Sequence, residues 1–236
     1  ATELFFLMSL AKASLWTASS TIVKIAVGLL VVKLLAISFG PEGLGQAGNF
    51  RQLITVLGVL AGAGIFNGVT TYVAQYQQQP RQLRALIGTA SAMVTGFSAL
   101  LALVFLLAAA PISTALFGHD RYQNVIRIVA FLQFGIAWAN LLLAFIKGYR
   151  DARGNALALI CGSITGVLGY VLCWWLGGYA GALTGLALVP ALLVFPALVI
   201  LKRRVPLPLS WLRPTWQPEM ARHLAKYTIM ALITAV

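Results

Sequence analysis

The sequence predicts an all-α protein that crosses a membrane several times. Hydrophobic residues make up 60% of the 236 positions, charged residues only 9%, and the mean hydropathy is +0.90. A soluble domain carries about 25% charged residues, so this composition is not that of an ordinary soluble fold. The hydrophobic residues also cluster into stretches close to the roughly 20 residues that one membrane-spanning helix needs.

Six such stretches follow one another along the chain. In order, we expect helices at residues 12–37, 46–74, 85–109, 124–147, 155–176 and 180–201. Gly and Pro mark the boundaries, because Pro interrupts a helix and Gly permits the backbone of a turn. These interruptions are Gly40-Pro41, Pro80, Pro111 with Gly118, Gly154-Asn155 and Gly177-Gly178. Residues 1–201 are therefore predicted to form an N-terminal lobe of six transmembrane helices.

A different composition follows the sixth helix. Residues 202–225 combine prolines with basic and aromatic residues, which is typical of a linker along the membrane surface with Trp211 and Trp216 at headgroup level. The segment 226–236 starts a seventh apolar helix that is too short to cross. Because a helix end inside the bilayer leaves carbonyl groups unsatisfied, we expect the chain to be part of a longer, two-lobe protein.

Lysine and arginine gather at alternate ends of the predicted helices. Arg121 and Arg127 fall at one set of ends, whereas 12 of the 17 cations fall at the other. Those 12 are Lys12, Arg81, Arg84, Lys147, Arg150, Arg153, Lys202, Arg203, Arg204, Arg213, Arg222 and Lys226. Such an excess marks cytoplasmic loops, so we expect the N-terminus and the loops after the second, fourth and sixth helices in the cytoplasm. The net charge of +12 then reflects topology, and no nucleic-acid partner is expected.

Nothing in the sequence favours catalysis. The acidic residues and histidines all fall outside the predicted spans; they are Glu3, Glu42, Asp120, Asp151, Glu219, His119 and His223. Paired carboxylates, metal-ligand spacing and a glycine-rich phosphate loop are all missing from the sequence. We therefore expect no enzyme, no metal site and no cofactor.

One cation lies deep inside the first predicted helix. Lys24 is about twelve residues into it, near mid-membrane, and shares one face with Thr17, Thr21 and Gly28. A polar stripe on an otherwise apolar helix faces a bundle interior or a water-filled cavity rather than lipid.

A second cation lies near the start of the second predicted helix. Arg51 lies among Asn49 and Gln52, and Asn67 lies deeper in the same stretch. A buried lysine or arginine costs at least about 2.5–3.5 kcal/mol at mid-bilayer, and no carboxylate falls inside the predicted spans to neutralise it. Either a carboxylate from another part of the protein or an anionic ligand must compensate, and we favour the ligand.

Other polar positions allow two interpretations each. Lys33 is nine residues from Lys24, on the opposite face, where a cavity role and snorkelling to the outer headgroups are both possible. Gln133, Asn140 and Lys147 repeat every seven residues along the fourth predicted helix. They are candidates for a second cavity wall, with hydrogen bonding between helices as the alternative.

A cavity with these residues suits a phosphate or pyrophosphate headgroup. Arginine binds phosphate oxygens in a bidentate way, lysine acts as a point charge, and amides and hydroxyls can bind sugar. A cationic drug would be repelled in such a site, where the effective dielectric constant is low.

Several segments resemble Wzx-type polysaccharide flippases of the multidrug/oligosaccharidyl-lipid/polysaccharide (MOP) superfamily. They are residues 9–17, 39–45, 49–70, 72–76, 147–155 and 177–188, and the likeness extends over essentially everything from Met8 onward. The resemblance implies two six-helix lobes forming a V around a central cavity that opens alternately to either side of the membrane.

The same resemblance implies a substrate, a location and partners. The substrate would be an undecaprenyl-pyrophosphate-linked oligosaccharide, the lipid III trisaccharide of enterobacterial common antigen, moved from the cytoplasmic to the periplasmic leaflet of the bacterial inner membrane. Related flippases place essential basic residues on their first two helices, at positions that Lys24 and Arg51 match. Membrane lipids and glycan polymerisation or assembly proteins are the expected partners.

Two other functions remain as alternatives. An ion-coupled multidrug exporter of the same superfamily should carry an Asp or Glu inside the membrane. A non-transporting scaffold for glycan assembly should keep its function when Lys24 or Arg51 is neutralised.

Overall fold

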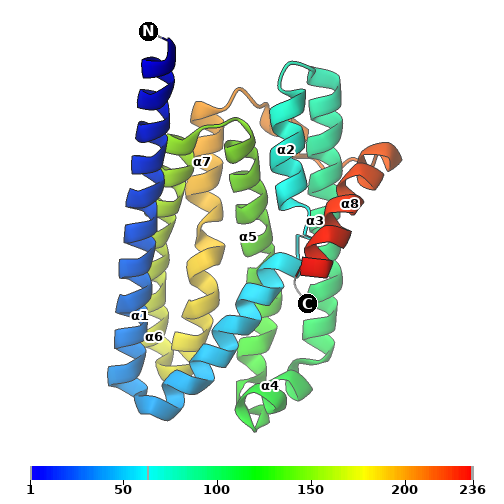
Figure 1. Cartoon of the computed structure of the whole chain (residues 1–236). Coiled ribbons are helices and arrows are strands. Elements are labelled where there is room, and N and C mark those ends of the chain that lie inside the picture. The colour runs from blue at the N-terminus through cyan, green and yellow to red at the C-terminus, as the bar shows by residue number, and fades with distance from the viewer. Residues whose placement is uncertain (1, 63, 235–236) are drawn as a thin grey trace.

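A computed structural model of the chain describes the backbone of residues 2–62 and 64–234 and the side chains of residues 11–62 and 64–226. The described backbone is an antiparallel helical bundle without strands (Figure 1). Within it, four helices are long and apolar enough to cross a membrane. Two of these, Ala11–Leu60 and Ala152–Arg204, have about 50 residues each and reverse direction partway, so that the chain crosses six times. This confirms the predicted all-α, six-helix lobe.

Helix α1 (Thr2–Leu60) consists of two legs joined at Gly40 (Figure 1). Gly40 has φ 68° and ψ −170°, a conformation that a Cβ atom disfavours, and the fixed φ of Pro41 then starts a new helix. We call residues 2–39 the first leg and residues 41–60 the second leg.

The prediction of one continuous helix over residues 46–74 was wrong. The second leg ends at Leu60, and α2 (Phe66–Tyr76) begins after an unwound stretch. Gly64 there has φ 68°, and the Phe66 ring packs directly against Gly62. Glycines this close together permit either tight helix packing or a break, and the sequence pattern does not distinguish the two.

The middle of the chain contains α3 (Pro80–Leu107), α4 (Ala109–Phe117), the short η1 (Asp120–Tyr122) and α5 (Gln123–Gly148). The sequence did not predict α4. Pro111 was interpreted as a helix breaker, but it lies in the first turn of α4, where no backbone N–H is needed for the helix.

Helix α6 (Ala152–Leu192) repeats the behaviour of α1, because it reverses at Gly178, which has φ 55°. Helix α7 (Val194–Arg204) completes the sixth crossing. The chain then runs through η2 (Leu209–Leu212) to α8 (Pro218–Thr234). Helix α8 starts eight residues before the predicted position, with Pro218 in its first turn; of the predicted segment 226–236, residues 235 and 236 lie outside the described residues.

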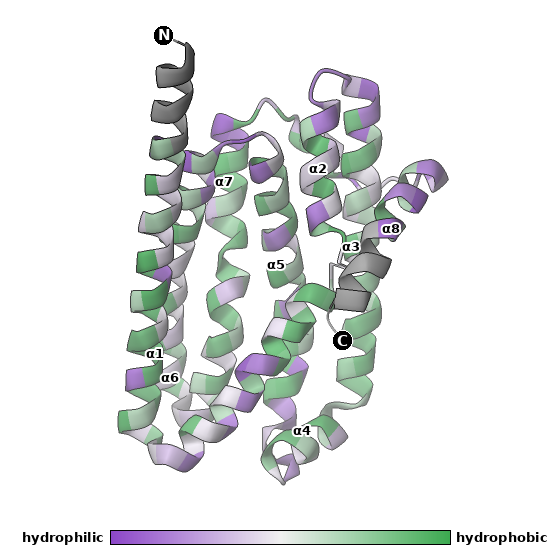
Figure 2. Ribbon diagram, in the orientation of Figure 1, coloured by the Kyte–Doolittle hydropathy of each residue, from purple (hydrophilic) through white to green (hydrophobic). Residues whose placement is uncertain are grey.

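Basic loops collect at one end of the bundle. The α2–α3 turn, the α5–α6 turn and the end of α7 lie at the same end as the N-terminus, whereas the Gly40 turn and α4 lie at the opposite end (Figure 1). Hydrophobic residues dominate most of the helices between these two ends, and hydrophilic residues are interspersed along the second leg of α1 and along α2 (Figure 2). The arrangement agrees with the charge asymmetry of the sequence and with a multi-pass membrane protein.

The α5–α6 turn joins several elements at that basic end. Arg204 of α7 donates to Asp151 from Nε at 2.6 Å and from Nη2 at 3.0 Å, and the Gly154 N–H donates to Asp151 at 2.8 Å. Arg153 lies 5.3 Å from the Trp16 ring of α1, a cation–π distance. Burial alone would raise the pKa of Asp151, but these hydrogen bonds and the charges of Arg204 and Arg153 together hold it below its ordinary value.

Candidate functional site

The first leg of α1 has one face directed at the bundle and one directed away from it. Ser20, Val31 and Leu35 on the inner face are 2%, 5% and 3% exposed. Lys24 shares that face by helical register, because it lies four and seven residues from Ser20 and Val31. Unlike these neighbours, Lys24 is exposed. Lys24 is thus a cation on the inner face that the described residues leave uncovered.

Arg51 reaches the same place from the second leg. Its Nη2 atom lies only 3.7 Å from the position that a Cβ atom on Gly28 would occupy. Lys24 is one helical turn from Gly28, about 6 Å along the axis. The structure therefore brings together two of the predicted site residues, which are 27 positions apart in the sequence.

Neither cation has an acidic or hydrogen-bonding side-chain partner among the described residues. Within residues 11–62 and 64–226, no ion pair or side-chain hydrogen bond joins Lys24 or Arg51 to another group. Asp151 is bound to Arg204 at the basic end, and Glu42 lies at the Gly40 turn. The pair is a positive site for which the described residues supply no counter-ion.

Hydroxyl groups next to the pair bond along their own helices. Thr21 Oγ1 donates to the Thr17 carbonyl at 2.9 Å, and Thr55 Oγ1 donates to the Arg51 carbonyl at 3.0 Å. Each hydroxyl has thus used its one proton and keeps its lone pairs as acceptors. Thr21 is exposed, so it can accept from a hydroxyl-bearing ligand beside Lys24.

The polar neighbours of Arg51 point in different directions. At about 100° per residue, Gln52 lies a quarter turn from Arg51 and Asn49 lies on nearly the opposite face. Both are exposed. Asn67 is also exposed, but it lies on α2, beyond the unwound stretch. The structure does not bring Asn49 to the cationic pair.

Helix α5 divides its three predicted residues between different environments. Gln133 is 1% exposed and donates from Nε2 to the Ser98 carbonyl of α3 at 2.8 Å. This placement favours hydrogen bonding between helices, the second interpretation that the sequence left open for Gln133. The Asn140 amide nitrogen packs 3.7 Å from a Cβ position on Gly58 and remains half-buried. Lys147 is exposed at the basic end of the bundle, away from mid-membrane.

Lys33 lies on the outer face of the first leg. Ile22 and Leu29 on that face are 66% and 65% exposed, and their register places Lys33 in line with them. An exposed apolar face of a membrane helix contacts lipid, where a lysine extends its ammonium group to the headgroups. This placement favours snorkelling, one of the two interpretations that the sequence left open.

The role of Gly28 was not predicted. Sequence spacing put it on the polar stripe with Lys24, but only the fold shows that the Arg51 guanidinium lies beside it, where a Cβ atom would be in ordinary contact at 3.7 Å. A glycine inside a polar stripe is the signal that could have indicated a contact from another helix.

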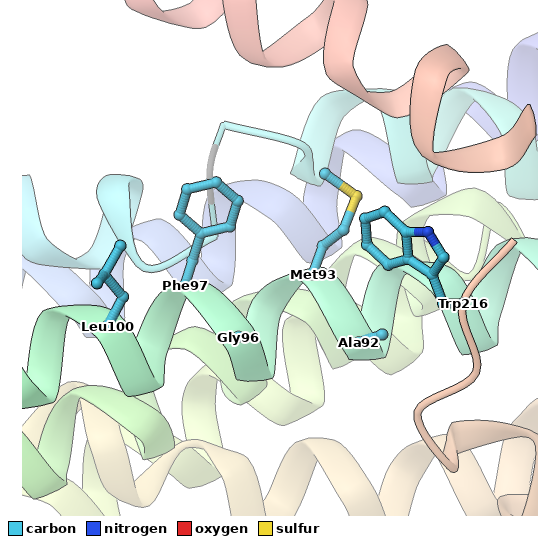
Figure 3. Close-up of a pocket in the computed structure, with 6 residues that line it drawn as sticks. All are labelled: Ala92, Met93, Gly96, Phe97, Leu100 and Trp216. Atoms are coloured by element: carbon cyan, nitrogen blue, oxygen red, sulfur yellow. The ribbon is translucent and has the colours of Figure 1, made fainter. Parts of the chain in front are cut away.

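A shallow apolar groove lies elsewhere, on α3. Its volume is about 200 Å³, and its walls are Ala92, Met93, Gly96, Phe97 and Leu100 of α3, with Trp216 of the linker beside Met93 (Figure 3). Such a surface suits hydrocarbon rather than a charged headgroup. It is separate from the cationic pair.

Solved structures of other proteins share the fold of this chain. The chain matches a MOP superfamily transporter from Pyrococcus furiosus, described as having a binding pocket of reverse polarity, with a TM-score of 0.71 and 16% identity over 94% of this chain and 52% of that one. It also matches an outward-facing multidrug resistance MATE transporter of the MOP superfamily, with a TM-score of 0.64 and 18% identity over 92% of this chain and 51% of that one. The fold is that of one lobe of a MOP superfamily transporter.

Curated relatives are much more similar in sequence than these solved structures. The chain is 67% identical to the lipid III flippases of Escherichia coli K12 and Shigella flexneri over 229 residues, which are 97% of this chain and 55% of each relative. It therefore spans about half the length of the relatives that it matches. No protein-family model matches the chain. The resemblance to flippases of the MOP superfamily that the sequence indicated is confirmed.

Proposed function

We propose that this chain is the N-terminal lobe of a flippase for a polyprenyl-pyrophosphate-linked oligosaccharide. The lipid III named in its relatives, 67% identical, is the proposed substrate. Lys24 and Arg51 bind the pyrophosphate in a water-filled cavity, and the polyprenyl tail stays in the lipid beside the protein. The substrate moves from the cytoplasmic to the periplasmic leaflet of the bacterial inner membrane, and the basic end of the bundle faces the cytoplasm.

One observation carries this proposal: the Arg51 guanidinium lies against Gly28, one turn from an exposed Lys24, without a carboxylate nearby among the described side chains. Two such cations are costly at membrane depth unless water or an anion compensates them. A pyrophosphate supplies that compensation, with oxygens for a forked guanidinium and a point charge for the ammonium group. Transport then needs no bond to be made or broken, so no catalytic residue is assigned.

Alternating access is the proposed cycle. The fold is that of one lobe of the MOP superfamily transporters. A second lobe of the longer protein would close the other side of the cavity. The unwound stretch between the second leg and α2 gives one crossing a place to bend. Broken helices of this kind commonly adjoin transporter binding sites.

The test uses Lys24→Ala and Arg51→Ala in the full-length protein, expressed in cells that need it for a lipid-linked surface glycan. Each variant should lower surface glycan at least about tenfold, which corresponds to ~1.4 kcal/mol, while the protein inserts normally. Lys33→Ala is the matched control, because it removes a cation from the same helix on the lipid-facing side. It should leave the glycan at the wild-type level.

Conservative exchanges separate charge from geometry. Lys24→Arg should retain most function if a point charge suffices, whereas Arg51→Lys should fail if the forked guanidinium is needed. Normal glycan from well-inserted Lys24→Ala and Arg51→Ala variants would contradict the proposal and favour a non-transporting scaffold.

A cationic-drug exporter fits the geometry less well. The MATE neighbours share the fold at 17–18% identity, which says nothing about cargo. Two cations without a described partner would repel a cationic drug. The acidic residues within the described candidate spans, Glu42 and Asp120, lie at the Gly40 turn and at the end of a span.

A further inference from the structure

A row of uncharged polar side chains runs along α2, between the cationic pair and the basic end. Asn67, Thr71 and Gln75 recur every four residues on α2 and so share one face, and Gln78 follows in the turn after α2; all four are exposed. The opposite face of α2 is packed, with Gly68, Val69 and Val73 buried. Helix α2 is thus amphipathic although it belongs to a membrane crossing.

Lipid does not suit such a face. On α2 the row runs from Asn67 to Gln75, a rise of about 12 Å at 1.5 Å per residue. It leads from the basic end toward the unwound stretch (Figure 1). Amides and hydroxyls at that depth face protein, water or a polar ligand. Among the described side chains none covers the row, since its members remain exposed.

The row also differs chemically from the cationic pair. Thr71 Oγ1 donates to the Asn67 carbonyl at 3.0 Å, so its lone pairs remain as acceptors. The amides of Asn67 and Gln75 each offer two donors and an acceptor. Sugar hydroxyls both donate and accept, and they carry no charge. A neutral row of mixed donors and acceptors therefore complements a glycan, as the two cations complement a pyrophosphate.

We propose that Asn67, Thr71, Gln75 and Gln78 bind the oligosaccharide part of the substrate and set its specificity, while Lys24 and Arg51 bind the pyrophosphate. This division of roles rests on the proposed function. It places the glycan along the half of the second crossing nearest the basic end. A row about 12 Å long would contact more than one sugar unit, so a short oligosaccharide is the proposed ligand class.

The same helix offers matched controls. Gln77, two residues from Gln75, donates from Nε2 to the Gly148 carbonyl of α5 at 2.7 Å. Thr70, beside Thr71, donates to the Phe66 carbonyl at 3.0 Å and to the Ala144 carbonyl of α5 at 3.3 Å. These side chains hold α2 against α5, so their loss should affect stability rather than sugar recognition.

The test measures binding of two probes to the purified full-length protein: a polyprenyl pyrophosphate without sugar, and the same lipid carrying the oligosaccharide. Thr71→Val and Gln75→Leu should weaken binding of the glycosylated probe about five- to tenfold, the effect of losing one or two hydrogen bonds, and leave the bare probe unchanged. Lys24→Ala and Arg51→Ala should weaken both probes. Thr70→Val and Gln77→Leu should lower thermal stability without changing the ratio of the two affinities.

The outcomes separate the two proposals. If Thr71→Val and Gln75→Leu bind both probes like wild type, the row contacts the second lobe or solvent, and the glycan assignment is overturned while the flippase proposal stands. The assignment is also overturned if these variants weaken both probes equally. If Lys24→Ala and Arg51→Ala change neither probe, the proposed function itself fails.

Discussion

The two legs of α1 and the α3–α5–α6 core treat polar groups in opposite ways. In the core, Gln133 is 1% exposed and hydrogen-bonded across helices. On the first leg, Lys24 lies on the inner face and yet stays uncovered. The Gln133 amide nitrogen holds α5 against α3, whereas the Lys24 ammonium group has no partner among the described side chains. A polar residue on an inward-directed helix face is thus a candidate site residue only where the described side chains do not cover it.

Glycines make the same distinction. A Cβ atom on Gly166 of α6 would lie 2.9–3.0 Å from Val189, including its backbone Cα and carbonyl oxygen. A Cβ atom on Gly28 would meet only the tip of Arg51, at 3.7 Å. Helix packing leaves too little room for a Cβ atom at Gly166, whereas Gly28 has space for one beside Arg51.

The largest expected effect comes from filling the packed glycine. Gly166→Leu should destabilise the full-length protein by about 1–3 kcal/mol. The two halves of α6, on either side of Gly178, must separate to accommodate the side chain. Thermal unfolding in detergent measures this loss. An unchanged unfolding temperature would show that the two legs of α6 are not in close contact.

Filling the open glycine should affect transport instead. Gly28→Leu should displace the Arg51 guanidinium and lower surface glycan about tenfold, or ~1.4 kcal/mol, with stability changed by no more than about 0.5 kcal/mol. Gly28→Ala, which adds only an ordinary contact, is the control and should behave like wild type. Equal stability losses for Gly28→Leu and Gly166→Leu would contradict the difference between a packed glycine at position 166 and an open one at position 28.

A smaller effect is expected where the two regions meet, at the α5–α6 turn. Because the folded pKa of Asp151 is lowered, its ion pair adds stability above its unfolded pKa of about 4, and this contribution is lost as the pH falls through the folded value. Asp151→Asn keeps the helix cap and should cost about 0.2–1 kcal/mol at pH 7. The measurement compares unfolding temperatures at pH 7 and at a pH below the lowered, folded-state pKa of Asp151. A difference between variant and wild type that persists at the lower pH would contradict the assignment to the charge.

The smallest effect is expected at Gln133. Gln133→Leu removes one hydrogen bond between α5 and α3, and such bonds contribute about 0.6 kcal/mol on average in membrane proteins. Surface glycan and the affinity for both lipid probes should remain at wild-type levels. A loss of probe affinity with normal stability would instead support the assignment of Gln133 to a cavity wall.

Much of the fold could be predicted from the sequence, because length and polarity act locally. The six crossings followed from apolar stretches of sufficient length, and the reversals occur at Gly40 and Gly178, where glycine had indicated turns. The unwound stretch after Leu60 and the short α4 could not be predicted. Gly62 and Gly64 are compatible with a tight helix interface or a break, and tertiary packing decides between them.

The candidate site was predictable only in part. Helical spacing alone put Lys24 and Lys33 on opposite faces, and the exposure of Ile22 and Leu29 identifies the lipid side. Spacing could not show which neighbour each residue meets. The contact of Arg51 with Gly28 and the bond from Gln133 to α3 both join residues far apart in the chain.

The account depends most on Lys24 facing a water-filled path that binds an anion. In the full-length protein, with Cys161 and Cys173 replaced by alanine, K24C and I22C place thiols at nearly the same depth on opposite faces. A membrane-impermeant sulfonate thiol reagent should modify K24C and leave I22C unmodified, and added lipid-linked oligosaccharide should slow the reaction at K24C. An unreactive K24C, or one whose reaction rate the substrate does not change, would contradict the central claim.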